Sequence, residues 1–231
     1  MRAHETMYDD QGYQVALFPL VSFVISQSDT GTFSHGGGQV YWATDYMGYN
    51  DSGTRQLRAP CYAPVDLKCI WLNRSNCVAV WESLTPVHLA NGMIDYLTVT
   101  VYHDNDIQNG ITQTGTIKRQ GEIFNRTGTG GNVTGDHMHL ETGYGRYTSS
   151  TSTAYGTSEY KYHITDWTAP KRLHNYNALF INDTVPRHTS GYPTEYPWVT
   201  YQGGSPLPPS HDKKKYRFKW VLYANKLRNN R

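Results

Sequence analysis

The sequence predicts a mainly β protein with an antiparallel, sandwich-like core, long loops and a C-terminal extension. The 231 residues include 21 Gly and 19 Tyr, only 17% of them are charged, and we find no long amphipathic helix. Strand-like alternation recurs between clusters of Gly, Asn, Asp, Ser and Pro. The predicted strands span residues 15–25, 39–46, 68–72, 77–82, 96–103 and 137–141.

One elaborated domain is expected, because this length buries a sizeable core without staples. We predict an N-terminal arm (1–17), a core (18–145), a region packed on the core or forming a small accessory unit (146–204), and a Pro-rich linker with a basic segment (205–231). Residues 211–231 hold eight Lys or Arg against one Asp, although the whole chain carries only +2. This segment is a docking arm, a segment that binds a polyanion through its positive charge, or a solvated tail. Within it, basic and apolar residues alternate over 216–223, which predicts a strand.

Cysteine usage and the N-terminus indicate where the chain is made. The three cysteines, Cys61, Cys69 and Cys77, cannot all pair, so we expect small core residues rather than a disulfide framework. The first residues show no apolar region followed by a small-residue cleavage site, and no run of about 18 apolar residues occurs. We therefore expect synthesis in the cytoplasm without an export signal, and no membrane span.

The most specific pattern lies in residues 134–141, which read Thr-Gly-Asp-His-Met-His-Leu-Glu. In a strand, His137 and His139 share one face, whereas Met138 and Leu140 point the other way into a core. Two imidazoles on a rigid element suit either two metal ligands or one ligand and one acid/base group. A pair of exposed surface histidines is the alternative.

Two upstream segments offer partners for that pair. His35 lies in a glycine-rich loop, and Asp45 is the only carboxylate between it and Asn50. His103 ends a strand rich in β-branched residues. Each residue also has an ordinary interpretation, as a loop histidine, a turn carboxylate and a surface histidine respectively.

Taken in order, these segments resemble the lysostaphin-like and LytM-like zinc metallo-endopeptidases, which cut peptide cross-links of bacterial peptidoglycan. The resemblance covers roughly residues 18–145 in four blocks. They comprise Ser34-His35 with Ala43-Thr44-Asp45-Tyr46, the hairpin from Leu57-Arg58-Ala59-Pro60 to Trp71, the strand end Thr100-Val101-Tyr102-His103, and the ending from Gly121-Glu122-Ile123 through Gly128-Thr129-Gly130 to His137-Met138-His139-Leu140-Glu141.

The resemblance implies a lysostaphin-type fold with a duplicated hybrid-motif-like arrangement, and it assigns roles that the spacing leaves open. It implies that zinc is bound by His35, Asp45 and His139. It further implies that His137 and His103 are the catalytic histidines, with His137 taking the proton of the attacking water and His103 stabilising the oxyanion or helping to protonate the leaving amine.

The chain departs from the family pattern at the first motif. The family places the Asp four positions after the His, where this chain has Gln39, and Asp45 follows His35 by ten residues. A loop insertion is harmless if both ends return to one site, and the longer spacing is similar to that of phage members. If Asp45 is not a ligand, Asp29, Asp51 or a water molecule completes the coordination.

The function expected from this resemblance is zinc-dependent hydrolysis of peptidoglycan cross-links by a phage tail-associated lysin or a holin-released endolysin. The expected partners are a peptidoglycan stem peptide or cross-bridge and, through the C-terminal region, other phage tail proteins; we expect no nucleic acid. The protein would act in the virion tail or at the cell wall after release. The alternatives are a non-catalytic tail-tip protein that keeps the peptidase fold, and a wall-glycan binding module.

Overall fold

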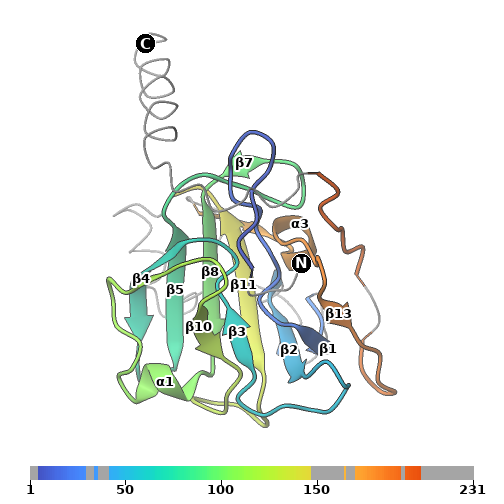
Figure 1. The fold of residues 1–231 in the computed structure, drawn as a ribbon. Helices are drawn as coiled ribbons and strands as arrows, with labels where there is room; N and C mark the ends of the chain where they lie inside the picture. The colour runs from blue at the N-terminus through green and yellow to red at the C-terminus, as the bar shows by residue number, and fades with distance from the viewer. Residues whose placement is uncertain are drawn as a thin grey trace.

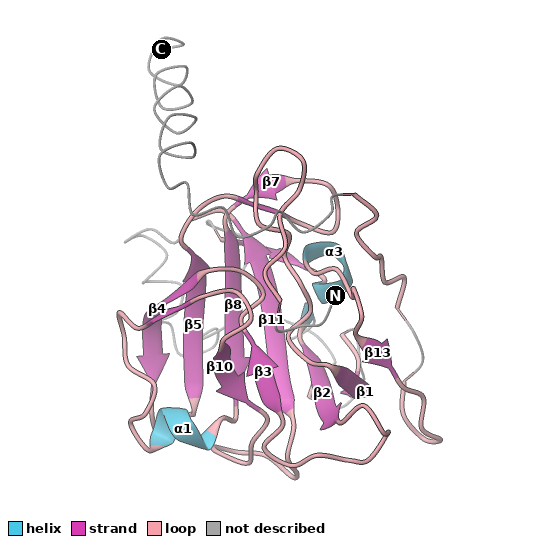
Figure 2. Cartoon of the chain, viewed as in Figure 1, coloured by secondary structure: helices cyan, strands magenta, loops and turns pink. Residues whose placement is uncertain are grey.

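The computed structural model describes residues 5–29, 34–35, 42–146, 164, 170–193 and 196–203. In these residues strands dominate, which confirms the mainly β prediction (Figures 1 and 2). The two helices among them are short, α1 (Asn105–Gln108) and α3 (Asn175–Ala178). The strands are β1 (Ser22–Gln27), β2 (Thr44–Tyr49), β3 (Pro60–Tyr62), β4 (Leu67–Asn73), β5 (Val78–Ser83), β6 (Val87–His88), β7 (Ile94–Asp95), β8 (Leu97–Tyr102), β9 (Ile117–Lys118), β10 (Ile123–Arg126), β11 (Met138–Tyr144), β12 (Lys171–Leu173) and β13 (Val185–Pro186).

A nine-stranded sheet forms the frame of the described part of the molecule. Its order is β13-β1-β2-β11-β8-β5-β4-β9. The ninth strand, β12, pairs with the C-terminal part of β11, after the residues of β11 that pair with β2. The pairs are antiparallel except for β1 with β13. The strand carrying the His-x-His pair, β11, therefore lies between β2 and β8, where neighbours on both sides fix its register.

The core lies between this sheet and a two-stranded ribbon of β3 and β10, which Figure 1 shows in front of the large sheet. Trp81 of β5 packs edge-on against Phe124 of β10, with ring centroids 5.6 Å apart. Alternate residues of the central strands face this core, among them Met138 and Leu140. Each fully buried side chain of this size stabilises the fold by about 1.5–3 kcal/mol. The layered arrangement agrees with the predicted sandwich-like core.

Residues 170–193 and 196–203 complete the core from the C-terminal side. The Asn175 side chain, buried at the start of α3, donates hydrogen bonds to the Tyr46 hydroxyl and the Leu140 carbonyl, both 3.1 Å away. Trp198 packs edge-on against Phe18 and Phe23, with centroids 5.1 and 5.7 Å away. This segment therefore contacts the strands that carry the candidate site.

Other expectations concern the cysteines, the tail and the membrane. The cysteines are all unpaired and buried, as the odd count predicted. The predicted strand over 216–223 and the Pro-rich linker fall outside the described residues. No helix in the described ranges has both the length and the apolar character needed to cross a membrane.

Candidate metal centre

The antiparallel pairing of β11 with β2 brings the first two predicted ligands together. His139 lies directly opposite Asp45 in this ladder, and cross-strand partners share one face of a sheet. His139 Nδ1 is 3.0 Å from Asp45 Oδ1. The face is the one away from the core, because the neighbouring residues Met138 and Leu140 are buried in the core.

His35 completes the cluster. Its Nδ1 lies 3.1 Å from the Ser28 carbonyl, to which it donates a hydrogen bond, and its Nε2 lies 3.5 Å from Asp45 Oδ1. His35 is 1% exposed, so this orientation is enforced by its surroundings. One ligand atom from each of His35, Asp45 and His139 falls within 4.8 Å of the other two. The structure thus brings together the three residues that the family resemblance implied as ligands.

The chemistry of this cluster fits a zinc ion. Asp45 Oδ1 is buried, and its polar neighbours are His139 Nδ1 at 3.0 Å and His35 Nε2 at 3.5 Å, so the three atoms surround a point that a proton or a metal ion could share. Two imidazole nitrogens and one carboxylate oxygen form a typical donor set for catalytic zinc. Burial lowers the pKa of His35, which keeps the neutral form that metals require.

The other carboxylates considered for this role lie elsewhere or make other contacts. Asp29 is buried, but its carboxylate is bound by His174 and its backbone N–H by the Tyr196 hydroxyl. Asp51 is exposed in a turn. Neither belongs to the His/Asp cluster found among the described residues, so Asp45 is the carboxylate that the geometry favours.

Glu141 supports His139 from the next position on the same face. Its Oε1 lies 3.1 Å from His139 Nε2, and its Oε2 accepts the backbone N–H of Ile164 at 2.9 Å. Burial alone would lower the pKa of His139, but the hydrogen bonds to Asp45 and Glu141 outweigh it and raise the pKa to about 9. In the zinc-free protein the His139 ring is therefore protonated on both nitrogens near pH 7, and zinc binding would displace the proton from Nδ1 while Nε2–H keeps donating to Glu141.

The two predicted catalytic histidines lie beside the cluster. His137 Nε2 is 3.5 Å from Asp45 Oδ2, and the rings of His137 and His103 have centroids 4.6 Å apart. Each ring donates from Nδ1 to a backbone carbonyl, His137 to Gly135 at 2.8 Å and His103 to Gly130 at 2.9 Å. Both Nε2 atoms are therefore unprotonated in the neutral rings and available as bases.

Two further features mark His103. Its backbone has φ +77°, a left-handed conformation that a residue with a side chain adopts at a cost and that is common at functional sites. Burial, followed by the nearby His137 and His139, lowers its pKa to about 4. His103 is therefore neutral near pH 7.

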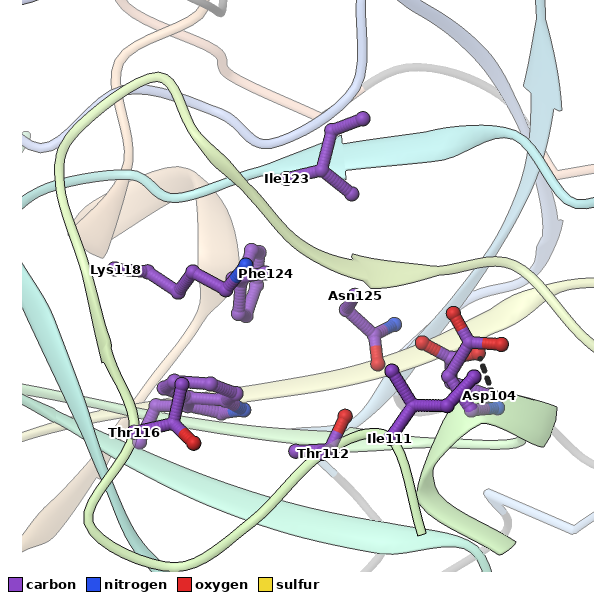
Figure 3. A pocket seen from close by; sticks show the side chains of 10 residues that line it. Asp104, Ile111, Thr112, Thr116, Lys118, Ile123, Phe124 and Asn125 are labelled. Carbon is purple, nitrogen blue, oxygen red and sulfur yellow. Dashed lines mark hydrogen bonds between the residues drawn. The ribbon is translucent and has the colours of Figure 1, made fainter. Parts of the chain in front are cut away.

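A cavity of about 110 Å³ occurs elsewhere, between α1, β5 and β10. Figure 3 shows Asp104, Asn125 and Phe124 in its wall, and none of the five predicted site residues lines it. The candidate centre lies on the outer face of the sheet, whereas Trp81 and Phe124 of the cavity wall belong to the core between the sheet layers. The cavity and the His/Asp cluster are therefore separate features.

Sequence reasoning missed the groups that orient the five residues. Glu141 ends the closing motif, and its spacing from His139, which places both on one strand face, is the signal that indicates its role. The carbonyls of Ser28, Gly130 and Gly135 carry no side-chain signal, so no residue pattern could have identified them.

Comparison with known sequences gives a phage protein among the relatives of this chain. No family model matches the chain. The chain is 33% identical over 129 residues to Morphogenesis protein 1 of Bacillus phage B103, a match that covers 56% of this chain and 32% of that protein. The chain thus spans about a third of the length of this curated relative.

Similar solved structures include zinc peptidases. A zinc-containing peptidase from Vibrio cholerae is 19% identical, with a TM-score of 0.37, over 59% of this chain and 40% of that chain. The lysostaphin catalytic domain from Staphylococcus simulans is 15% identical, with a TM-score of 0.34, over 55% and 82%. Lysostaphin from the same organism is 14% identical, also at 0.34, over 67% and 60%. Similarities at this distance do not assign a family.

Proposed function

We propose that this protein is a zinc-dependent endopeptidase that hydrolyses peptide cross-links of bacterial peptidoglycan, as a phage tail-associated lysin or an endolysin. The observation that carries the proposal is the convergence of all five residues named from the sequence. His35, Asp45 and His139 form a buried N,N,O cluster, and His103 and His137 stand beside it. Such a cluster next to two unprotonated imidazole nitrogens suits hydrolysis of an amide.

The metal would be held by His35 Nε2, Asp45 Oδ1 and His139 Nδ1. Zinc bound there would supply Lewis acidity, polarising the scissile carbonyl and lowering the pKa of water. The second oxygen of Asp45 lies 3.5 Å from His137 Nε2, so the carboxylate would stabilise the positive charge that His137 gains when it accepts a proton. Glu141 keeps the His139 ring in the orientation that presents Nδ1.

The two remaining histidines would move protons. His137 Nε2 accepts the proton of the attacking water, a contribution typically worth about 10² to 10⁴ in rate. His103 also presents an unprotonated Nε2, because its Nδ1–H is bound to the Gly130 carbonyl. His103 can therefore donate to the oxyanion or the leaving amine only after it has itself accepted a proton, which makes the pair a relay rather than a fixed acid and base.

The phage setting is supported by a sequence relative that is a phage morphogenesis protein. This name favours attachment of the present protein to a virion, and it equally suits a tail-tip protein that keeps the fold without catalysis. The two functions differ in whether the protein releases peptides from a wall. A wall-glycan binding module, in contrast, would hold no zinc.

The test combines zinc content with hydrolysis of purified cell walls. We expect His139→Ala to lose both zinc and activity, and His137→Ala to keep zinc while activity falls at least about 100-fold. His188→Ala, at an exposed histidine in another part of the chain, is the control and should change neither. Activity should disappear with a chelator and return with zinc.

Mass spectrometry of the released muropeptides then identifies the bond cleaved. Wild-type protein that binds zinc but releases no peptide from several wall types would favour the non-catalytic tail protein. Unchanged zinc in His139→Ala would refute the ligand assignment.

A further inference from the structure

Two glycines of one loop, Gly128 and Gly130, contact the backbones of both proposed catalytic histidines. The Gly130 N–H donates to the His103 carbonyl, and the Gly130 carbonyl accepts from His103 Nδ1, each at 2.9 Å. The His103 N–H in turn donates to the Cys77 carbonyl at 2.9 Å. The main chain and the ring of His103 are thus fixed together, in the left-handed conformation noted above.

Gly128 makes the matching contact with the second histidine. Its N–H donates to the His137 carbonyl at 3.0 Å, and its carbonyl accepts the His137 N–H at 3.1 Å. This reciprocal pair is an isolated antiparallel bridge just before β11. One loop therefore ties together two histidines that are 34 positions apart in the sequence and whose rings lie 4.6 Å from each other.

Both positions require glycine because of close approach. A Cβ on Gly128 would lie 2.1 Å from the His103 carbonyl oxygen, and a Cβ on Gly130 would lie 2.4 Å from Cys77 Sγ. Neither glycine has a positive φ, so the missing side chain serves space and not backbone conformation. Any larger residue must displace His103 or the Cys77 side chain that packs beneath the loop.

We propose that Gly128 and Gly130, here called the glycine clamp, are positioning residues: they hold His103 as the Nδ1–H tautomer, fix the backbone of His137 and so set the spacing of the two Nε2 atoms. The inference rests on the proposed function for its catalytic consequence, but the positioning itself is a property of the folded protein. The clamp holds the carbonyl that accepts from His103 Nδ1 and the backbone register of His137 at once. Displacing one side therefore shifts the other.

The primary experiment is ¹⁵N NMR of the histidine rings in the full chain, where one-bond and long-range couplings identify the protonated nitrogen. In wild-type protein we expect His103 and His137 as Nδ1–H tautomers, with assignments from His103→Asn and His137→Asn. Gly130→Ala should shift the His103 ring toward a tautomer mixture. Thr129→Ala is the matched control, because this side chain lies between the two glycines and is exposed.

A compensating substitution makes the steric argument testable. Cys77 has φ +53°, a conformation that glycine adopts without strain, and its sulfur is the atom closest to a Gly130 Cβ. We therefore expect Cys77→Gly combined with Gly130→Ala to restore the wild-type tautomer signals. Gly128→Ala should not be rescued in this way, because its clash is with the His103 backbone.

Kinetics provide the second readout. Gly130→Ala should keep its zinc and lose about 10²-fold in kcat, the effect expected of a displacement near 1 Å, with a much smaller change in KM. The double variant should recover most of this loss. Wild-type tautomer signals in a folded Gly130→Ala protein, or failure of Cys77→Gly to restore them, would overturn the proposal. Because the NMR readout needs no substrate, an absence of peptidase activity would count against the proposed function and not against the clamp.

Discussion

Glu141→Gln tests whether a buried carboxylate outside the ligand set determines metal affinity. Glu141 is 2% exposed and uses both oxygens, one toward His139 Nε2 and one on the Ile164 N–H. Glutamine keeps the shape but removes the charge. It also offers only one oxygen, so one of the two N–H groups must face an amide that is itself a donor.

The size of the effect follows from this geometry. Second-sphere partners of ligating histidines typically change metal affinity by about 10- to 100-fold, or about 1.4–2.8 kcal/mol. The carboxylate of Glu141 is buried, where charge is poorly screened, so we expect the upper half of this range. The donor left without an acceptor should also lower the free energy of unfolding by about 1–3 kcal/mol.

Zinc affinity is measured by competition with a chromophoric chelator at neutral pH, and stability by denaturant unfolding of the zinc-free protein. The control is Glu82→Gln, because Glu82 is a similarly buried carboxylate of the same sheet whose Oε1 lies 3.5 Å from Arg146 Nη2. The control should leave zinc affinity unchanged. A zinc dissociation constant for Glu141→Gln within about threefold of wild type would show that the contact between Glu141 and His139 contributes nothing to metal binding.

Two other predictions concern the zinc-free fold. Asn175→Leu leaves the buried Leu140 carbonyl and Tyr46 hydroxyl without their donor, so unfolding experiments should show a loss of about 2–4 kcal/mol, and a loss under about 1 kcal/mol would contradict the assigned bonds. The pKa of His103 is about 4 in the fold against 6.5 unfolded, so the unfolded state binds more protons between these values. Stability should therefore fall as the pH is lowered from 6.5 to 4, by up to about 3 kcal/mol. The slope of stability against pH should be smaller in His103→Asn than in wild type. Equal slopes in the two proteins would show that His103 does not cause this pH dependence.

The strands were predictable where alternation is strong, and less so where loops decide the boundary. Predicted strands 68–72, 77–82 and 96–103 correspond closely to β4, β5 and β8. The segment 15–25 alternates throughout, but the regular ladder of β1 begins only at Ser22, and Val15 and Leu17 form isolated bridges. These bridges pair with β6 and with Phe180, and a partner 163 positions away leaves no trace in local periodicity.

The candidate site was predictable as a set of residues but not as a geometry. The shared face of His137 and His139 follows from strand periodicity alone. The position of Asp45 depends on the β2–β11 register, which the spacing of ten residues from His35 does not reveal. The tautomers of the histidines depend on carbonyls of residues 130 and 135, which become acceptors only once the chain has folded.

The alternation of β11 separates the chemistry of this protein from its stability. Odd positions, His139 and Glu141, face the candidate centre, whereas the even positions Met138 and Leu140 fill the core. Truncation on the core side, such as Leu140→Ala, should therefore cost about 2–5 kcal/mol of stability, whereas substitutions of the ligands act first on metal binding. The burial that keeps His35 neutral for metal binding also removes the Asp45 carboxylate from water, which is unfavourable for a charged group. A strand anchored on both sides by β2 and β8 can hold such a costly arrangement in place, and a bound cation would then offset its cost.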